Sequence, residues 1–402
     1  MFNRTLRFLL TAGILFGMLS ALPVPVARAM GANRYVSTTG ANSTDCTSSA
    51  APCKTIAYAI TQSGLASADQ IHIAAGTYHE NLTIDRPVSL IGVQENLTII
   101  DGGAGAAPGG GGGTTLVVIN SGVVATLRDL TVQNAAHPGG DGGGIYNSGT
   151  LSLVHVIVAG NTALIGGGIF NEGSLSLSDV FINGNSASAG PGGGLFNNSS
   201  SAMTLSNVTL SGNTASGYSG GIHHQGSGPI QLTNVTFSNN TAHIGGAMTI
   251  TAVASATFIN STITNNHKDA VAGSAVGGIA DYGTFSMVNT IIYGNDVPNC
   301  GVGGTLTSLG YNLDGGATCL TPASAQPSDH PNANPLLGPL AQNGGYAPTH
   351  ALLFGSPAID AGTNTDCPAT DERGVARPYG TQCDIGAYEY NFFNIFLPLT
   401  LK

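Results

Sequence analysis

A glycine-rich pattern that recurs along the middle of the chain constrains the fold most. Gly142–Asn147 reads Gly-Gly-Gly-Ile-Tyr-Asn, it returns at 166–171 and 192–197, and looser Gly-Gly copies begin at 220, 245 and 277. An apolar-alternating run follows each copy and ends in asparagine. These asparagines lie 24, 28, 27, 26 and 29 residues apart: Asn161, Asn185, Asn213, Asn240, Asn266 and Asn295. Such a period is typical of a solenoid, whose units bury their apolar faces against one another.

One repeat shows how a coil is built. Met203 and Leu205 alternate with polar residues, and Val208 and Leu210 do the same, but the alternation slips by one at Asn207. A strand with a period of two cannot slip without turning, so the pattern predicts two short strands joined by a bend. The Gly-Gly-Ile segment supplies a third strand. The sequence therefore predicts an all-β, right-handed, three-stranded parallel β-helix, with coils roughly 4.8 Å apart.

The bend position forms a column of polar residues through the predicted stack. Asparagine tolerates the left-handed conformation that a tight bend requires, and stacked side chains can hydrogen-bond from coil to coil. The column contains Asp129, His155, Asp179, Asn207, Asn234, Asn260 and Asn289. His155 between two carboxylates has two interpretations. It is either a metal ligand or proton carrier, or a structural replacement for asparagine in the ladder, and the second is favoured because too few ligands accompany it.

A second column follows the Gly-Gly-Ile pattern and consists of Tyr146, Phe170, Phe196 and His223. Because neighbours on a strand alternate faces, Ile145, Ile169, Leu195 and Ile222 should point inward and this column outward. An outward aromatic ladder can stack on sugar rings, so these four residues are candidates for carbohydrate binding. The alternative, which is favoured, is that the column packs beneath the variable turn loops.

Composition limits the function. Of the 402 residues only 8% are charged, and the net charge is −10, which argues against nucleic acid as a partner because such binding needs a basic stripe. Between Gly142 and Asn266 the charged residues are Glu172 and Asp179 alone. Lyases and glycosidases of β-helix folds work with clustered carboxylates or a basic side chain. The repeats therefore predict a protein without catalytic residues, metal ligands or a cofactor.

The two ends of the chain differ from the repeats. Residues 1–29 have the basic start, apolar run and small-residue cleavage site of an export signal, and a membrane anchor is the alternative. Residues 30–69 are expected to cap the first coil, with a short helix within 54–62. Residues 391–402 form an apolar tail, either a sorting signal or a strand against the cap. After the expected export signal, no segment is long and apolar enough for a transmembrane helix.

Six cysteines in an exported chain predict disulfides. They form three local pairs that flank the repeats: Cys46 with Cys53, Cys300 with Cys319, and Cys367 with Cys383. Six cysteines allow 15 pairings, and proximity favours the local set. A zinc site is disfavoured because the chain lacks a Cys-x-x-Cys pattern.

Three stretches resemble known families. Residues 71–103 resemble the opening of parallel β-helix proteins of the pectin-lyase-like class, and the Gly-Gly copies with Phe237-Ser-Asn-Asn240 resemble the repeats of polymorphic outer-membrane proteins. Residues 334–389, with Gly355–Gly362 and Cys383–Glu389, look like the choice-of-anchor Q module of exported bacterial proteins. The resemblances imply a β-helix over 70–325, a C-terminal module over 326–390, and a secreted or cell-surface location. They imply no reaction.

The C-terminal module also concentrates charge. Its charged residues within a short span are Asp360, Asp366, Asp371, Glu372, Arg373, Arg377, Asp384 and Glu389. They form either an acid–base or calcium site, or ion pairs that fix an irregular fold, and the structural interpretation is favoured.

These observations lead to one expectation of function and one alternative. The expectation is an exported structural or adhesive β-helix that binds a polysaccharide or cell-surface glycan without catalysis. The alternative is a polysaccharide lyase or glycoside hydrolase, with its site on the loops near Gly102–Gly113 or Gly273–Asp281.

Overall fold

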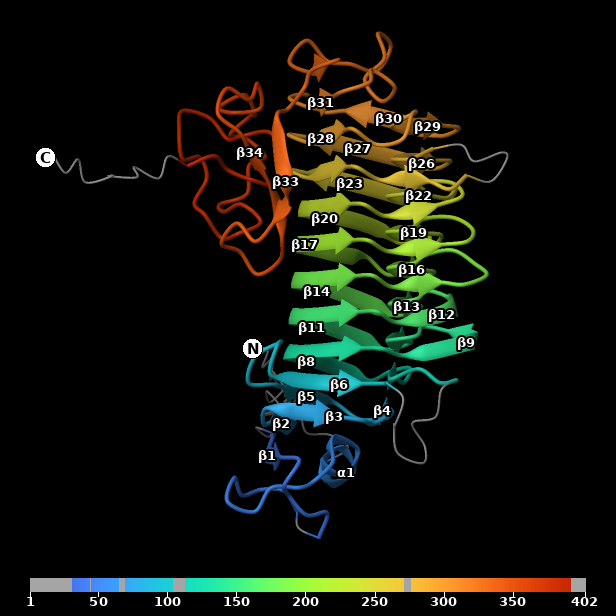
Figure 1. The fold of residues 1–402 in the computed structure, drawn as a ribbon, viewed down its shortest axis with the longest axis vertical. Coiled ribbons are helices and arrows are strands. Elements are labelled where there is room, and N and C mark those ends of the chain that lie inside the picture. The colour runs from blue at the N-terminus through green and yellow to red at the C-terminus, as the bar shows by residue number, and fades with distance from the viewer. Residues whose placement is uncertain (1–30, 44, 65–68, 104–112, 271–275, 392–402) are drawn as a thin grey trace, which may run out of the picture.

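The computed structural model describes residues 31–391, except for residue 44 and the ranges 65–68, 104–112 and 271–275. The expected export signal, most of the tail, and most of the Gly102–Gly113 loop lie outside the described residues. Figure 1 shows parallel strands stacked into a long coil, with a cap at the N-terminal end and the C-terminal module beside the upper coils. The predicted right-handed parallel β-helix is confirmed.

The first sheet of the solenoid, sheet A, holds the two strands that meet at each bend. In the middle coils the two form one bent strand, and in the later coils they are separate strands. Its members are β1 (Asn33–Val36), β2 (Asp69–Ile73), β3 (Gly76–Tyr78), β5 (Val88–Ile91), β6 (Thr98–Asp101), β8 (Val124–Gln133), β11 (Thr150–Ala159), β14 (Ser174–Asn183), β17 (Met203–Ser211), β20 (Pro229–Ser238), β23 (Ser255–Ile259), β24 (Thr262–Thr264), β27 (Thr284–Val288), β28 (Ile291–Tyr293), β30 (Thr305–Ser308), β31 (Leu313–Asp314) and β32 (His330–Pro331). The stack thus continues past residue 325, where the sequence placed its end.

Sheet B is built from the Gly-Gly-Ile segments. Its strands are β4 (Leu82–Ile84), β7 (Val117–Ile119), β10 (Ile145–Asn147), β13 (Ile169–Asn171), β16 (Leu195–Asn197), β19 (Ile222–His224), β22 (Met248–Ile250), β26 (Ile279–Asp281) and β29 (Cys300–Val302). Gly142, Gly166 and Gly192 precede these strands with φ between 62° and 74°, a conformation that glycine adopts without strain. The glycines therefore set the turn into sheet B.

Sheet C is short and lies between the closing asparagines and the loops that lead back to sheet B. Its strands are β9 (Ala136–Asp141), β12 (Thr162–Ile165), β15 (Ser186–Ala187), β18 (Thr214–Ala215), β21 (Thr241–Ala242) and β25 (His267–Lys268). All described pairings within sheets A, B and C are parallel and join one coil to the next, as in β11 with β14 and β13 with β16.

The bend in sheet A lies where the alternation slips. In the pairing of β11 with β14, Val154 aligns with Ser178 and Val156 with Val180, so His155 and Asp179 fall outside the ladder. His155 has φ 51° and Asp179 has φ 54°. At this bend each coil thus turns at one left-handed residue, which lets the residues on both sides of the bend keep their apolar side chains inside.

The core is a set of apolar columns, one per inward position. Leu153, Leu177, Leu205 and Leu232 form one column, and Val158, Ile182, Leu210 and Phe237 form another, all with at most 1% exposure. The closing asparagines form a buried column of their own: each of Asn161, Asn185, Asn213, Asn240 and Asn266 donates from Nδ2 to the next asparagine's Oδ1 at 2.8–3.0 Å. In the sequence these asparagines marked only the period of the repeat. The ladder that they form was not predicted.

The N-terminal cap contains the helix α1 (Ile56–Gln62). The Thr55 side chain accepts from the Tyr58 amide, and the carboxylate of Glu80 accepts from the amides of Ile56 and Ala57 at 2.9 Å. These acceptors satisfy N–H groups that a helix start leaves free. Ile56, Ala59 and Ile60 are buried, so the helix covers the apolar end of the first coils.

The C-terminal module lies against sheet A, on the strands that follow the bend (Figure 1). It contains one antiparallel pair, β33 (Leu337–Ala341) with β34 (Thr349–Leu352). The bend column donates to its backbone: Asn234 Nδ2 to the Thr370 carbonyl at 2.8 Å, Asn260 Nδ2 to that of Asp384 at 3.0 Å, and Asn289 Nδ2 to that of Thr363 at 3.0 Å. The bend column is thus also the surface on which the module docks.

Candidate functional site

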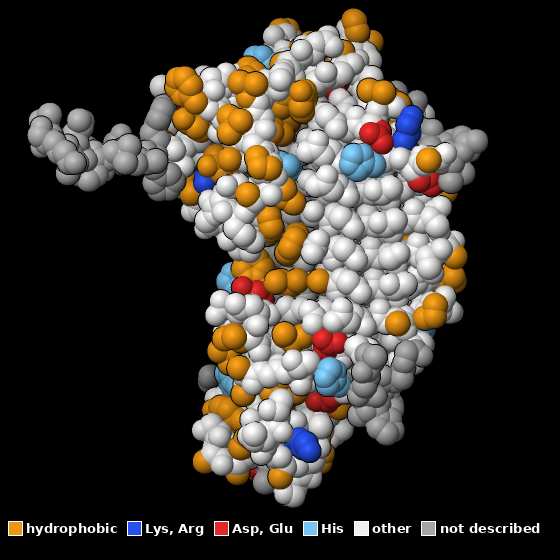
Figure 2. All heavy atoms as spheres, viewed as in Figure 1, with side chains coloured by type: hydrophobic (Ala, Val, Ile, Leu, Met, Phe, Trp, Pro, Cys, Tyr) orange, Lys and Arg blue, Asp and Glu red, His pale blue; other side chains and the backbone are white. Residues whose placement is uncertain are grey.

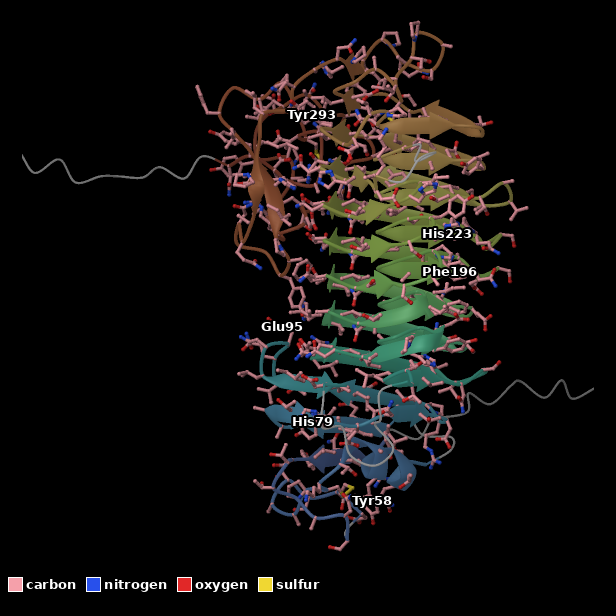
Figure 3. The ribbon with its side chains drawn as sticks, turned by 45° about the vertical axis from the view of Figure 1, so that its right-hand side comes forward. Tyr58, His79, Glu95, Phe196, His223 and Tyr293 are labelled. Carbon is pink, nitrogen blue, oxygen red and sulfur yellow. A yellow bond between two sulfur atoms is a disulfide. The ribbon has the colours of Figure 1, made fainter. Side chains whose placement is uncertain are left out.

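The outward column of sheet B forms a continuous stack of rings. Tyr146, Phe170, Phe196 and His223 align in register on consecutive strands. Their ring centroids are separated by 5.1, 4.9 and 5.3 Å, with interplanar angles of 4°, 21° and 6°. Figure 3 shows Phe196 and His223 on neighbouring coils of the same face.

Most of this stack is covered. Phe170 is 6% exposed and Phe196 is 5% exposed, and their faces are occupied by the neighbouring rings. Tyr146 is half-buried, and its Oη donates to Glu172 Oε2 at 2.7 Å. The two phenylalanines therefore have no free face for a sugar ring, and their burial agrees with packing beneath the turn loops.

The stack ends in a pocket because the column changes from rings to small side chains. After His223, the next two positions in register are Thr249 and Ala280. The smaller side chains leave a hollow of about 520 Å³. It is lined by Pro191, Tyr218, His223, Gln225, Thr249, Thr251, Ala252 and Tyr282.

Two tyrosines that the sequence analysis did not single out provide the aromatic surface of this pocket. Tyr218 is 42% exposed and Tyr282 is 46% exposed. The Tyr218 ring is tilted by 50° against His223, with centroids 5.8 Å apart. Tyr218 precedes β19 and Tyr282 follows β26, so both lie outside the repeating positions. The sequence signal that could have identified these two tyrosines is their position next to Gly-Gly-Ile copies.

The pocket is electrically neutral. The described side chains that line it include no lysine, arginine, aspartate or glutamate. Burial lowers the pKa of His223 to about 4, against a smaller opposing effect of Gln225, so the imidazole is uncharged near pH 7. Its Nδ1 is buried and has no hydrogen-bond partner among the described residues.

This arrangement suits a sugar ring. Carbohydrate sites combine aromatic faces, which contact the apolar faces of the ring, with amide and hydroxyl groups, which bond its hydroxyls. Tyr218 and Tyr282 supply the faces, and Gln225 and Thr251 supply polar groups. The described lining lacks the pair of carboxylates used in most glycoside hydrolysis. Its groups that can carry a proton are one imidazole and two phenols.

The bend column brings Asp129, His155 and Asp179 together on consecutive coils. His155 Nδ1 lies 3.0 Å from Asp129 Oδ1, and Nε2 lies 3.9 Å from Asp179 Oδ2. The column continues by amides, with Asn207 donating to Asp179 at 3.1 Å and Asn234 to Asn207 at 3.0 Å. Farther along, Asn289 Nδ2 donates to Asn260 Oδ1 at 3.1 Å. Side chains thus link neighbouring coils along most of this bend.

Tyr346 of the C-terminal module covers His155, with ring centroids 5.1 Å apart. Its phenol oxygen is buried and has no partner among the described residues. Burial, with the carboxylates of Glu95, Asp129 and Asp179 nearby, raises the pKa of Tyr346. In Figure 2, acidic and histidine side chains gather at the notch below the module, and Figure 3 places Glu95 on a loop there. Among the described residues, no group of three or more His, Cys, Asp or Glu is arranged to hold a metal ion.

Two arginines of the C-terminal module form internal ion pairs. Arg373 contacts Asp371 at 2.7 Å, and Arg377 contacts Glu389 at 3.1 Å, with side chains at most 2% exposed. Burial raises the pKa of Asp384 to about 7, with Glu389 adding to the effect. Asp384 accepts from the amides of Asp360 and Tyr390. These contacts are those of a network that fixes an irregular segment.

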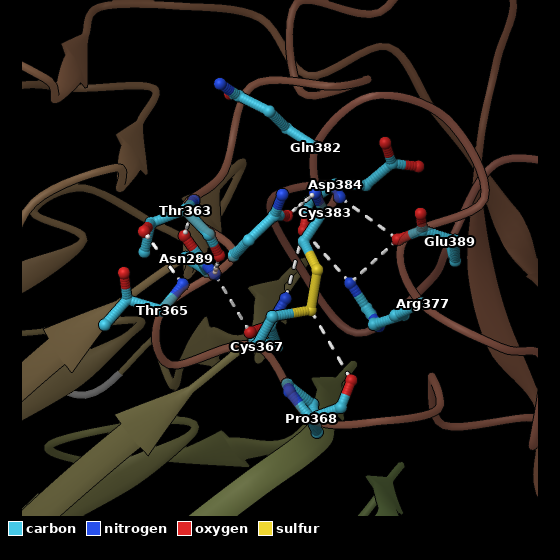
Figure 4. The surroundings of a disulfide bond; sticks show 12 residues. Asn289, Thr363, Thr365, Cys367, Pro368, Arg377, Gln382, Cys383, Asp384 and Glu389 are labelled. Carbon is cyan, nitrogen blue, oxygen red and sulfur yellow. Dashed lines mark hydrogen bonds and ion pairs between the residues drawn. A yellow bond between two sulfur atoms is a disulfide. The ribbon is translucent and has the colours of Figure 1, made fainter.

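The described cysteines form three disulfides, Cys46–Cys53, Cys300–Cys319 and Cys367–Cys383. Figure 4 shows the last of them between the Asn289–Thr363 contacts and the Arg377–Glu389 pair. Disulfides persist in oxidising surroundings, so they are consistent with an extracellular protein. No described helix has both the length and the apolar character needed to cross a membrane.

The chain matches no family model, and a search of curated proteins finds no match. Solved structures share the fold at low identity. Pectate lyase Pel9A is 16% identical with a TM-score of 0.47, over 91% of this chain and 98% of that one. Pectin methylesterase from carrot is 13% identical with a TM-score of 0.40, over 69% and 89%. Pectin methylesterase PemA from Erwinia chrysanthemi is 17% identical with a TM-score of 0.33, over 67% and 82%. Likeness at this level concerns the fold alone.

One expectation from the sequence is corrected by this comparison. The scarcity of charge in the repeats led to the prediction that the chain is not an enzyme. The solved proteins above are all named as enzymes, a pectate lyase and two pectin methylesterases, which contradicts that prediction.

Proposed function

We propose that the protein is an exported enzyme of the polysaccharide lyase or glycoside hydrolase class, which binds its substrate across sheet B. In this proposal a sugar ring lies in the pocket beside His223, between Tyr218 and Tyr282. The observation that carries the proposal is the pocket itself: it is open, it has two half-exposed tyrosines, and hydroxyl and amide groups surround them.

The position of the pocket supports a polymer as the substrate. Sheet B continues past the pocket in both directions, from β16 and β19 to β26 and β29. Parallel coils repeat every roughly 4.8 Å, so neighbouring sugars of one chain would meet successive strands. A long, regular sheet face therefore suits a long ligand, with the pocket as the place where one ring is held most firmly.

Within this class, the lining favours elimination over hydrolysis. Most glycoside hydrolysis uses two carboxylates, which the described lining does not supply. Elimination requires one group that takes the proton from the carbon next to a carbonyl and one that gives a proton to the leaving oxygen. The carbon–oxygen bond breaks as a carbon–carbon double bond forms. An imidazole and two phenols are the proton carriers available for these two roles.

The test is a product assay on the full secreted chain with a panel of plant and bacterial polysaccharides. Binding is followed by affinity electrophoresis, new reducing ends by a sugar assay, and unsaturated ends by ultraviolet absorbance. We expect at least one polymer to be bound and cleaved with unsaturated ends. New reducing ends without unsaturation would assign hydrolysis instead of elimination, and binding without any product across the panel would contradict the enzymatic proposal.

A further inference from the structure

We infer that the sugar held in the sheet B pocket is uncharged: a uronic acid whose carboxyl group is esterified, which keeps the carbonyl that elimination requires, or, where cleavage is by hydrolysis, a neutral sugar. This inference rests on the proposed function and narrows its substrate. It follows from the distribution of charge around the pocket and from the groups that line it.

Among the described residues, the lining of the pocket offers no cationic side chain that could pair with a sugar carboxylate. The sequence from Gly142 to Asn266 contains no lysine or arginine. Figure 2 shows few charged side chains over the middle coils on the face in view. A polyuronate bound along these coils would therefore meet no positive charge from them.

Three of the described cations elsewhere are engaged by other groups of the protein. Arg373 and Arg377 are buried in ion pairs of the C-terminal module. Lys268, on sheet C, donates from Nζ to the Val297 carbonyl at 3.1 Å, and the His267 side chain beside it faces Asp296 at 3.4 Å. The Lys268 ammonium is thus bound by a backbone carbonyl of the next coil, and His267 faces a carboxylate there.

A carboxylate in this pocket would be poorly stabilised. Recognition of carboxylates in proteins relies on arginine or lysine, and burial of an unpaired charge is strongly unfavourable. A cation bridge would need several oxygen ligands from carboxylates, and the lining supplies none. The net charge of −10 also disfavours the approach of a polyanion.

The same lining is well suited to an uncharged ring. Tyr218 and Tyr282 expose aromatic faces, and Thr251 and Gln225 carry hydroxyl or amide groups, which can donate to or accept from sugar hydroxyls. His223 adds a neutral ring, since burial lowers its pKa to about 4. These contacts do not depend on charge, so they should not weaken in salt.

The experiment compares two polymers with one backbone, polygalacturonan and its fully methyl-esterified form, together with the neutral polymers galactan and mannan. Affinity is measured by isothermal titration on the full chain at low and high salt. The inference predicts that an uncharged polymer binds at least about tenfold more tightly than polygalacturonan, a readily measured difference, and that its affinity changes little with salt.

A variant with an added charge makes the test specific to the pocket. Ala252→Lys places a cation at an exposed position of the pocket lining, and it should raise the affinity for polygalacturonan without raising that for the ester. Equal or tighter binding of polygalacturonan by the unmodified chain, weakened by salt, would overturn the inference but leave the proposed function standing. Failure of every polymer to bind would overturn both.

Discussion

Thr209 Oγ1 donates a hydrogen bond to Glu372 Oε1 at 2.7 Å, although 163 residues separate them. Thr236, one coil further, donates to the other oxygen of the same carboxyl group. One buried side chain of the C-terminal module therefore bridges two coils of the solenoid. The module is held by specific contacts, and its position beside the upper coils is part of the fold.

The bridge predicts how the chain responds to loss of Glu372. Glu372→Ala should lower the free energy of unfolding by about 2–4 kcal/mol, because the buried Thr236 hydroxyl loses this acceptor, Thr209 keeps only the Pro348 carbonyl, and a cavity forms. Glu372→Gln keeps one acceptor and the shape, so its effect should be about half as large. Chemical denaturation measures both. Thr204→Ala, an exposed position on β17, serves as the control, and equal stabilities of all three variants would contradict the bridge.

Asp281 predicts a pH dependence of stability. Burial raises its folded-state pKa from 3.8 to about 6, and its Oδ2 is buried without a partner among the described residues. Between these two pKa values the folded state holds a proton that the unfolded state has lost. The stability of the fold therefore falls as pH rises from about 4 to about 6. Below and above this window the contribution of Asp281 to stability does not change with pH. Asp281→Asn should make melting temperature less dependent on pH across it. An unchanged slope in the variant would exclude Asp281 as the cause.

The buried asparagine ladder is expected to be a main source of stability. Asn213 donates to the Ile182 carbonyl at 3.0 Å and to Asn240 at 2.9 Å, and it accepts from the Asn185 amides. Asn213→Ala should cost about 3–5 kcal/mol, since it leaves several buried groups unpaired. Asn198→Ala, at an exposed position, should change stability by less than about 0.5 kcal/mol. Comparable losses in the two variants would contradict a special role for the ladder.

Substitutions in the ring stack and in the pocket distinguish an effect on stability from an effect on binding. Phe196→Ser should lower the free energy of unfolding by about 3–5 kcal/mol, because a buried ring is lost. Tyr282→Ala should have a small effect on stability, because its side chain is half-exposed. Thermal denaturation of both variants decides this. If Phe196→Ser melted like the unmodified chain but bound no polysaccharide, the column would be a sugar platform after all.

Substitutions of Tyr346 and His155 test how the C-terminal module docks on the bend column. Because the Tyr346 phenol oxygen is buried without a partner near carboxylates, Tyr346→Phe should leave stability unchanged or raise it by about 1 kcal/mol. Tyr346→Ala should lower it, because the ring on His155 is lost. His155→Asn should be tolerated if the bend ladder is structural. Loss of enzymatic activity in His155→Asn at unchanged stability would instead assign it a role in the reaction.

Local patterns in the sequence were enough to predict the coil. The slip at Asn207 predicted a bend, and that residue has φ 56°, because alternation depends only on neighbouring residues. The role of Asn213 could not be read in the same way. A closing asparagine that ends a strand and one that forms a buried ladder have the same spacing, and only the stacking of coils distinguishes them.

The pocket was not predicted because it arises from a difference between coils. Phe196, His223, Thr249 and Ala280 occupy equivalent positions, and the space comes from the decrease in side-chain size along them. Its exposed tyrosines lie in turns that no repeat pattern covers. Tyr346 reaches His155 through docking of the module, a contact between distant parts of the sequence that no periodicity encodes.

The proposed binding of polysaccharide at the sheet B pocket is tested most directly by a double variant, Tyr218→Ala with Tyr282→Ala. The measurement is its affinity for the best-bound polymer, compared with the unmodified chain and with Tyr379→Ala, which removes an exposed tyrosine of the C-terminal module. At an unchanged melting temperature, the account predicts a loss of at least about tenfold in the double variant and none in Tyr379→Ala. Equal affinities in all three proteins would contradict it.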